Sequence, residues 1–416
     1  MTNAKPRAQI SSLSRRTASA ALTFAIVLGI IATQAAHAQT FTVLYNFEGN
    51  FQGRSPADGV NPNGNGGLIQ DPEGNLYGTT QNGGAHEIGT IFKVDQSGNE
   101  TVLYSFTGGA DGGLPLAGLF RDPQGNLFGV NSGGELPGGP CPPCTTPFFG
   151  AVFKLDTSNN LTVLHMFQDN NGGTPATRLV SVGGDLYGTT GNGGTAPCSC
   201  GTIFRVTKTG GYTVLYSFTG GADGAGPNGL VRDATGNLYG STFTGGIGGR
   251  SSGAGTIFKL DTAGKFTVLY NFRGHEDGYR PIGRLLVNLE GGLIGVTSGG
   301  GDSTCHCGVV FRLDKSGKET VLHTFTQEGN GGFPDGGLLR FGGNFYGTAQ
   351  GSSASYLYRT GANGDFSVLH TFSSATADGV QPQGELIRGN DGSILGVTLQ
   401  GGTGCLSCGV IFKYTP

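Results

Sequence analysis

The sequence predicts an all-β protein, a seven-bladed β-propeller in which each blade is a four-stranded antiparallel sheet. Glycine supplies 81 of the 416 residues and hydrophobic residues 36 %, which is too apolar for a disordered chain and typical of short strands joined by tight turns. Three short motifs each recur seven times in step. Finally, the last strand of the chain finds a partner only in its first one.

Residues 1–38 precede the repeats and are typical of a signal peptide. A basic segment is followed by the apolar stretch "ALTFAIVLGIIA" and by the small residues "AHA" at 36–38. The apolar stretch is shorter than the ~20 residues of a membrane span, so we expect an exported protein, periplasmic or extracellular, with no membrane span after cleavage. The remainder, 39–416, is expected to be one propeller domain and a monomer. It has 21 basic and 28 acidic residues, a balance that argues against nucleic acid as a partner.

The repeats are defined by three motifs, named here b, c and d for the strands they predict. Motif b is "GNLYGTT" (74–80) with copies at 125–131, 184–190, 236–242, 291–297, 343–349 and 392–398. Motif c is "GTIFKV" (89–94) with copies at 150–155, 201–206, 255–260, 308–313, 355–360 and 409–414. Motif d is "TVLYNF" (42–47) with copies at 101–106, 162–167, 213–218, 267–272, 320–325 and 367–372. From Leu44 to Leu369 six intervals cover 325 residues, or roughly 54 each.

A fourth apolar piece, strand a, precedes motif b, as in "GGLIQD" (66–71) and "GRLLVN" (283–288). Turns such as Asp71-Pro72-Glu73-Gly74-Asn75 join a to b, and "QSGNE" or "TAGK" joins c to d. Such tight turns make consecutive strands antiparallel neighbours. Each unit is therefore an a–b–c–d meander, apolar on both faces, as expected for sheets that pack against copies of themselves.

The two chain ends complete each other. "GVIFKYTP" (409–416) is a c strand with no d strand after it, whereas "TFTVLYNF" (40–47) is a d strand with no a, b or c before it. Pairing these two strands in one blade closes the ring and covers both sheet edges. We therefore expect a propeller whose N-terminal strand completes the C-terminal blade.

The repeated words resemble a known family. "GNLYGTT…GTIFKVD…TVLYSF" is similar to the GloVer (Gloeo-Verruco) tandem repeat of exported bacterial proteins, and more distantly to NHL-type propeller blades. The resemblance covers 40–416 and implies an exported repeat protein. It implies no catalytic residues.

In this meander the b–c and d–a connections emerge on one face, and they are the long and variable ones, which makes that face the expected place for function. Each d–a connection there holds an Asp or Asn four residues before a Pro: Asp58, Asp111, Asn171, Asp223, Asp277, Asn330 and Asp378. These residues are candidates for a ring at the channel mouth that holds a cation such as calcium or a polar ligand. The alternative is a turn in which the side chain bonds local backbone, and the strict spacing favours it.

All eight cysteines lie as close pairs in b–c loops: Cys141 and Cys144, Cys198 and Cys200, Cys305 and Cys307, Cys405 and Cys408. In an exported protein this favours four local disulfides. Pairing between adjacent blades and a Cys₄ zinc site are the alternatives for the first two pairs.

No acid, base or nucleophile cluster distinguishes one blade, so a non-catalytic binding or scaffold protein is favoured, its ligand an unidentified glycan or protein and no cofactor predicted. The alternatives are an enzyme on a polysaccharide or lactone-like substrate, using some of the five Asp residues above with a divalent metal, and a structural or adhesion protein.

Overall fold

A computed structural model describes residues 1, 39–48, 58–62, 67–133, 149–168, 171–175, 177–248, 252–288, 290–326, 331–373, 377–403 and 408–416. The chain divides into two units, Met1–Thr40 with Pro416, and Phe41–Thr415. The second unit carries the fold. The predicted signal peptide lies almost wholly outside the described residues.

Seven sheets make up this unit, and each consists of consecutive antiparallel strands except where the chain ends meet. The first two are β2 (Val60–Pro62), β3 (Ile69–Gln70), β4 (Leu76–Asn82), β5 (Thr90–Val94) and β6 (Glu100–Ser105), then β7 (Phe120–Arg121), β8 (Leu127–Asn131), β9 (Ala151–Leu155) and β10 (Leu161–Met166). The next two are β11 (Val180–Val182), β12 (Asp185–Thr190), β13 (Thr202–Val206) and β14 (Tyr212–Ser217), then β15 (Ala225–Pro227), β16 (Val231–Arg232), β17 (Leu238–Thr244), β18 (Thr256–Leu260) and β19 (Phe266–Asn271). The fifth and sixth are β20 (Tyr279–Val287), β21 (Leu293–Gly299), β22 (Val309–Leu313) and β23 (Glu319–Thr324), then β24 (Phe333–Pro334), β25 (Leu339–Phe341), β26 (Asn344–Gln350), β27 (Ser355–Gly361) and β28 (Phe366–Phe372). The seventh is β29 (Val380–Arg388), β30 (Ile394–Gln400), β31 (Val410–Thr415) and β1 (Thr40–Asn46).

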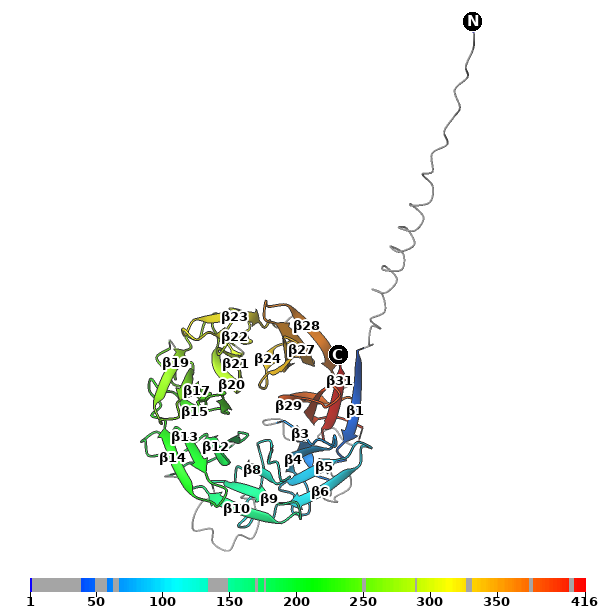
Figure 1. Cartoon of the computed structure of the whole chain (residues 1–416), viewed down its shortest axis with the longest axis vertical. Helices are drawn as coiled ribbons and strands as arrows, with labels where there is room; N and C mark the ends of the chain where they lie inside the picture. Colours follow the sequence, from blue (N-terminus) through cyan, green and yellow to red (C-terminus); the bar gives the residue numbers. More distant parts are fainter. Residues whose placement is uncertain are drawn as a thin grey trace. The chain divides into compact units, whose positions relative to one another are not determined.

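The sheets are the blades of a β-propeller, arranged around a central axis with the a strands innermost and the d strands outermost (Figure 1). The predicted fold class is thus confirmed. The described residues contain no helix long and apolar enough to span a membrane.

Ring closure follows the prediction. In the seventh sheet β1 pairs with β31, in the order β1-β31-β30-β29, and Figure 1 shows the blue N-terminal strand beside the red C-terminal one. Phe47 N donates to Gly409 O at 3.2 Å, as Phe106 N donates to Gly89 O at 3.1 Å in the first blade. The closing blade is therefore built like the others, but one of its strands is held without a covalent turn.

In five of the seven blades the inner-strand pairing begins earlier than the sequence predicts. The sequence places the Pro that ends each Asp-x-x-x-Pro segment in a connection, yet Val60 and Pro62 pair with Asn82 and Thr80 at the end of the b strand. Ala225 and Pro227 pair with Thr244 and Thr242 in the same way. The Pro ring packs on the neighbouring blade at this point, since a Cβ added at Gly409 would lie 2.7 Å from Pro62 Cδ and one at Gly201 would lie 2.6 Å from Pro227 Cδ.

The core consists of aromatic rings that meet between neighbouring blades. The last Phe of each d strand lies 5.1–5.3 Å, between ring centroids, from the aromatic residue of the next c strand: Phe47–Phe92, Phe106–Phe153, Phe167–Phe204, Phe218–Phe258, Phe272–Phe311, Phe325–Tyr358 and Phe372–Phe412. The c-strand ring also covers the Gly of motif b in its own blade. A Cβ added at Gly78 would lie 2.6 Å from Phe92, and one at Gly240 would lie 2.5 Å from Phe258. The Gly is therefore required by the ring that packs on it.

Candidate functional site

A cavity of about 320 Å³ lies where the inner strands of five blades meet. Its wall includes one residue or more from each of these strands: Arg178, Asn228, Arg284, Asp335 and Gly384. Thr189 and Phe243, at the ends of b strands β12 and β17, also line it. The b strands end on the face of the b–c connections, so the cavity lies on the side where the sequence predicts function.

The side chains of this cavity break the seven-fold repeat. One inner-strand position precedes a buried Leu in every blade, and in four blades it is glycine: Gly67, Gly118, Gly229 and Gly337. In the other three, every second blade in turn, it is Arg178, Arg284 and Glu385. The fold thus needs no side chain at this position.

The three charged side chains meet at one carboxylate oxygen. Glu385 Oε2 lies 3.1 Å from Arg284 Nη1 and 3.9 Å from Arg178 Nη1, and Arg284 Nε donates to Leu230 O at 3.1 Å. Their side chains are largely buried, with exposed fractions of 20 % for Arg178, 27 % for Arg284 and 11 % for Glu385. Two guanidinium groups share one carboxylate, so the cluster carries one unneutralised positive charge.

Arg178 is the least satisfied of the three. Within the described part of the chain it makes no hydrogen bond, and its ion pair with Glu385 is long. Burial lowers the pKa of Arg178, the like charge of Arg284 lowers it further, and Glu385 opposes both effects. Glu385 Oε1 is buried and has no hydrogen-bond partner in the described residues. Such a cluster gains little stability from its ion pairs, because desolvation offsets their attraction.

Asp335 is the acidic residue that lines the cavity itself, whereas Glu385 is bound to two of its lining arginines. Its Oδ2 accepts from Gln350 Nε2 at 2.5 Å. Burial raises the pKa of Asp335 to about 6, against hydrogen bonds from Gln350 and Gln383 that lower it. Asp335 is therefore the group of this cavity whose charge changes just below neutral pH.

The carboxylates of the d–a connections are bound to the outer strands. Tyr45 donates to Asp58 at 2.9 Å, and three equivalent pairs are Tyr104 with Asp111 (2.9 Å), Tyr216 with Asp223 (3.0 Å) and Tyr270 with Asp277 (2.9 Å). The same Asp oxygens accept backbone N–H groups, from Glu48 at 3.0 Å and from Thr107, Thr219 and Arg273 at 2.8 Å. In the seventh repeat Asp378 Oδ2 lies 2.5 Å from His370 Nε2.

Asn171 behaves similarly, since its Oδ1 accepts from Gln168 N at 2.8 Å; Asn330 lies outside the described residues. These hydrogen bonds give the strict spacing a structural reason, because each of these side chains binds its turn to the outer strand of the preceding blade. Among the described residues no three His, Cys, Asp or Glu side chains form a group that could hold a metal ion. Calcium binding by the predicted ring stays a prediction.

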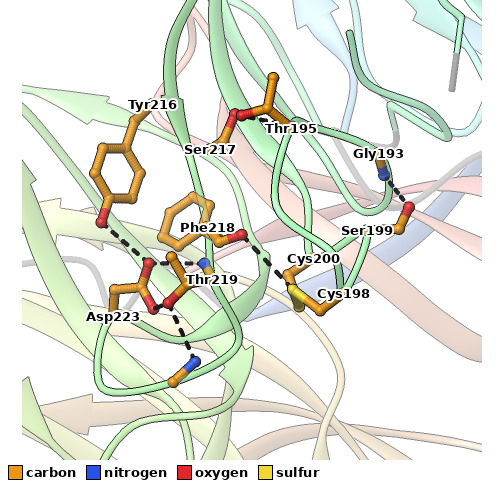
Figure 2. Close-up of a disulfide and its surroundings, with 11 residues drawn as sticks. Gly193, Thr195, Cys198, Ser199, Cys200, Tyr216, Ser217, Phe218, Thr219 and Asp223 are labelled. Atoms are coloured by element: carbon orange, nitrogen blue, oxygen red, sulfur yellow. Dashed lines mark hydrogen bonds between the residues drawn. A yellow bond between two sulfur atoms is a disulfide. The ribbon is translucent and has the colours of Figure 1, made fainter. Parts of the chain in front are cut away.

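Two of the predicted cysteine pairs are local disulfides, Cys198–Cys200 and Cys305–Cys307. Cys408 is disulfide-bonded as well; Cys141, Cys144 and Cys405 lie outside the described residues. Figure 2 shows the first disulfide beside the end of the outer strand, where Cys198 Sγ lies 3.7 Å from Phe218 O and Ser199 Oγ accepts from Gly193 N at 2.7 Å. The Asp223 turn follows this outer strand, and a Cβ added at Gly220 in that turn would lie 2.7 Å from Cys200 Sγ, so the disulfide loop and the Asp turn pack against each other.

Histidines occupy the Tyr position of three outer strands and stack on the next blade. His165 lies 3.7 Å from Tyr212, His323 lies 3.9 Å from Phe366 and His370 lies 3.7 Å from Phe41, between ring centroids. Burial lowers the pKa of His165 and of His323 to about 4. These two residues are neutral packing groups at physiological pH.

Comparison with known proteins gives the family of the chain. The Gloeobacter/Verrucomicrobia repeat matches residues 25–195, 143–306 and 198–412. The chain belongs to this family. Among proteins of curated function, none matches the sequence.

Solved structures of other propellers resemble the fold of this Gloeobacter/Verrucomicrobia repeat protein. A candidate 6-phosphogluconolactonase from Bacteroides uniformis aligns with a TM-score of 0.52 at 14 % identity, over 84 % of this chain and 99 % of its own. YCF48 from Cyanidioschyzon merolae aligns with a TM-score of 0.51 at 9 % identity, over 90 % of this chain and 99 % of its own. At these identities the similarity concerns the fold alone.

Sequence reasoning missed the three charged residues of the cavity. The motifs describe what the inner strands share, and "GRLLVN" (283–288) predicts a strand without indicating a role for Arg284. The signal that identifies the site is the contrast between blades, because a charged residue stands where four other repeats have glycine.

Proposed function

We propose that the protein is an exported, non-catalytic binding propeller that holds its ligand at the central cavity, on the face of the b–c and d–a connections. The observation that carries this proposal is the convergence of Arg178, Arg284 and Glu385, from alternate blades, on a position that the fold otherwise fills with glycine. Charged groups placed where stability does not need them are typical of binding sites.

Export is supported by the disulfides, because such bonds persist outside the reducing cytoplasm. The signal-peptide features of residues 1–38 support the same compartment. Both acids at this site are held by partners, Glu385 by Arg284 and Asp335 by Gln350, which supports binding rather than catalysis.

A glycan array probed with the protein tests the proposal. We expect binding to a defined set of glycans, recovered chemically unchanged, which separates a binding protein from an enzyme. In the variant Gly229→Ala the added Cβ would lie 2.4 Å from Arg284 Cγ, so it displaces a cavity side chain without changing the charge. We expect this variant to lose binding.

The matched control is Asp261→Ala. Asp261 lies in the c–d turn on the opposite face, where it accepts from Ala263 N and Lys265 N at 3.0 and 2.8 Å. Loss of glycan binding in this variant, together with full binding in Gly229→Ala, would place the ligand on the other face and contradict the proposal.

A further inference from the structure

Three guanidinium groups and two carboxyl groups lie at or beside the central cavity, those of Arg178, Arg284 and Arg280 against those of Glu385 and Asp335, so positive charges exceed negative ones by one. Arg178 and Arg284 both approach Glu385 Oε2, at 3.9 Å and 3.1 Å. One carboxylate neutralises one guanidinium, and Arg178 keeps its hydrogen-bond donors unused within the described residues. A guanidinium presents a planar fork of N–H groups that fits a carboxylate with two parallel hydrogen bonds. A ligand carboxylate therefore supplies both the missing charge and the missing acceptors.

The cavity lining also includes one aromatic ring. Phe243 lines the same cavity and is 36 % exposed, one of the large apolar side chains exposed among the described residues. Arg280 Cζ lies 5.2 Å from the centroid of the Phe243 ring, which adds a cation on this side. An exposed aromatic ring next to polar groups suits a ligand with an apolar C–H face and a polar edge, as a pyranose ring has.

Hydroxyl groups complete the lining. Thr174, Thr177 and Thr189 all lie on the cavity wall. Thr177 Oγ1 and Thr189 Oγ1 are 2.8 Å apart, and Thr174 Oγ1 accepts from Asn192 Nδ2 at 3.1 Å. A hydroxyl both donates and accepts, so these side chains match the hydroxyl groups of a sugar.

From these groups we infer that the cavity binds a sugar acid of the uronate type, with its carboxylate at Arg178 and Arg284 and its ring on Phe243. The inference rests on the proposed binding function and adds the class of ligand. The cavity of about 320 Å³ accommodates one such monosaccharide unit.

Glu385 makes the inference testable in two directions. Its carboxylate occupies Arg284 in the absence of ligand, and it repels an incoming carboxylate. Neutralising Glu385 is therefore expected to strengthen binding of the anion, whereas neutralising Arg178 is expected to weaken it. If the cluster had a purely structural role, both variants would be less stable, and the affinity for the anion would not rise in one variant and fall in the other.

The experiment is calorimetric titration of the protein with D-glucuronate, with D-glucose as the neutral sugar and with inorganic phosphate as an anion without a ring. We expect glucuronate to bind more tightly than either. Arg178→Gln should weaken glucuronate about tenfold or more, or about 1.4 kcal/mol, and Glu385→Gln should strengthen it. Phe243→Ala should weaken glucuronate and leave phosphate unchanged.

The control variant is Arg205→Gln, because Arg205 lies on the c strand of the third blade and pairs with Asp185 at 3.8 Å, outside the cavity. Circular dichroism melts establish that each variant is folded. Equal affinity for glucuronate and glucose, an unchanged affinity in Arg178→Gln, or tighter binding of phosphate than of glucuronate would each overturn the inference. Glycan-array binding without any preference for acidic sugars would refute the ligand class alone, whereas an array without any bound glycan would refute the proposed function.

Discussion

A substitution at Phe47 would test whether the N-terminal strand closes the propeller. Phe47 follows β1, its side chain is fully buried, and its ring centroid lies 5.2 Å from that of Phe92 in the first blade. Phe47→Ala removes this ring from a core that also includes Leu68, Val397 and Ile411. Core Phe→Ala substitutions cost about 3–5 kcal/mol, so we expect the free energy of unfolding to fall by that amount in chemical denaturation.

The matched control is Phe272→Ala. Phe272 holds the same position after β19, is equally buried, and lies 5.1 Å from Phe311. The equilibrium cost should be similar in the two variants. They should differ in local opening, because β19 is joined to β18 by the turn Asp261–Lys265, whereas β1 is held to β31 only by hydrogen bonds and packing.

Hydrogen exchange of the backbone amides measures that difference. In Phe47→Ala we expect faster exchange in β1 and β31 than in the rest of the protein, and in Phe272→Ala no selective change in β18 and β19. Uniform exchange in both variants, or a loss of stability below about 1 kcal/mol in Phe47→Ala, would refute the idea that the N-terminal strand closes the ring without a covalent turn.

Three further predictions concern single residues. Tyr358 Oη is buried without a hydrogen-bond partner in the described residues, so Tyr358→Phe should keep or raise the melting temperature, and a clear drop would contradict this. Asp223→Ala removes the carboxylate that accepts hydrogen bonds from the Tyr216 hydroxyl and the Thr219 backbone N–H. The free energy of unfolding in urea should fall by about 1–3 kcal/mol, while glycan binding at the central cavity should persist. Burial, and after it the neighbouring Asp58 for Glu100 and Asp277 for Glu319, raises the pKa of both residues from 4.5 to about 7. The folded protein therefore holds these protons to higher pH than the unfolded chain does, and the free energy of unfolding should fall as pH rises from about 4.5 to about 7. The double variant Glu100→Gln with Glu319→Gln should flatten this dependence on pH.

The fold could be predicted because packing repeats itself. Gly78 and Phe92 recur as a pair in six blades, with Tyr358 in place of Phe in the sixth, since the ring of the c strand needs the glycine beneath it. Phe47 recurs at the end of every d strand because each interface between blades needs the same ring. Residues that satisfy one repeated packing requirement appear as repeated words, and such words can be counted without a structure.

The connections were harder to predict. Asp58 and its equivalents recur as strictly as the core residues, and the structure shows the bonds that give the reason, to Tyr45 and to the backbone. Spacing alone could not separate this role from a ligand role, because both need the same acidic side chain. Likewise, the sequence placed Cys198 and Cys200 in one loop but could not exclude partners from another blade, since connectivity depends on distances between loops.

Residues that depart from the repeat have different consequences on the outer strands and on the inner strands. One position at the start of the outer strands is Phe266 or Tyr212 in some repeats, where the ring stacks on the neighbouring blade, and Leu161 or Glu319 in others. These changes are scattered, and each concerns its own interface.

The departures at the channel instead meet one another. Arg178 and Glu385 are more than two hundred residues apart in the chain and come from different blades, yet they approach within 3.9 Å, and Arg284 joins them from a third blade. Unrelated substitutions would not bring two guanidinium groups to one carboxylate oxygen. The four glycines at the same position show that the fold is stable without these charged side chains. Buried ions that the fold does not require are costly unless a ligand or partner uses them. For a repeat protein, the site is therefore found by asking which departures from the repeat converge in space, and in this propeller they converge on the cavity at its axis.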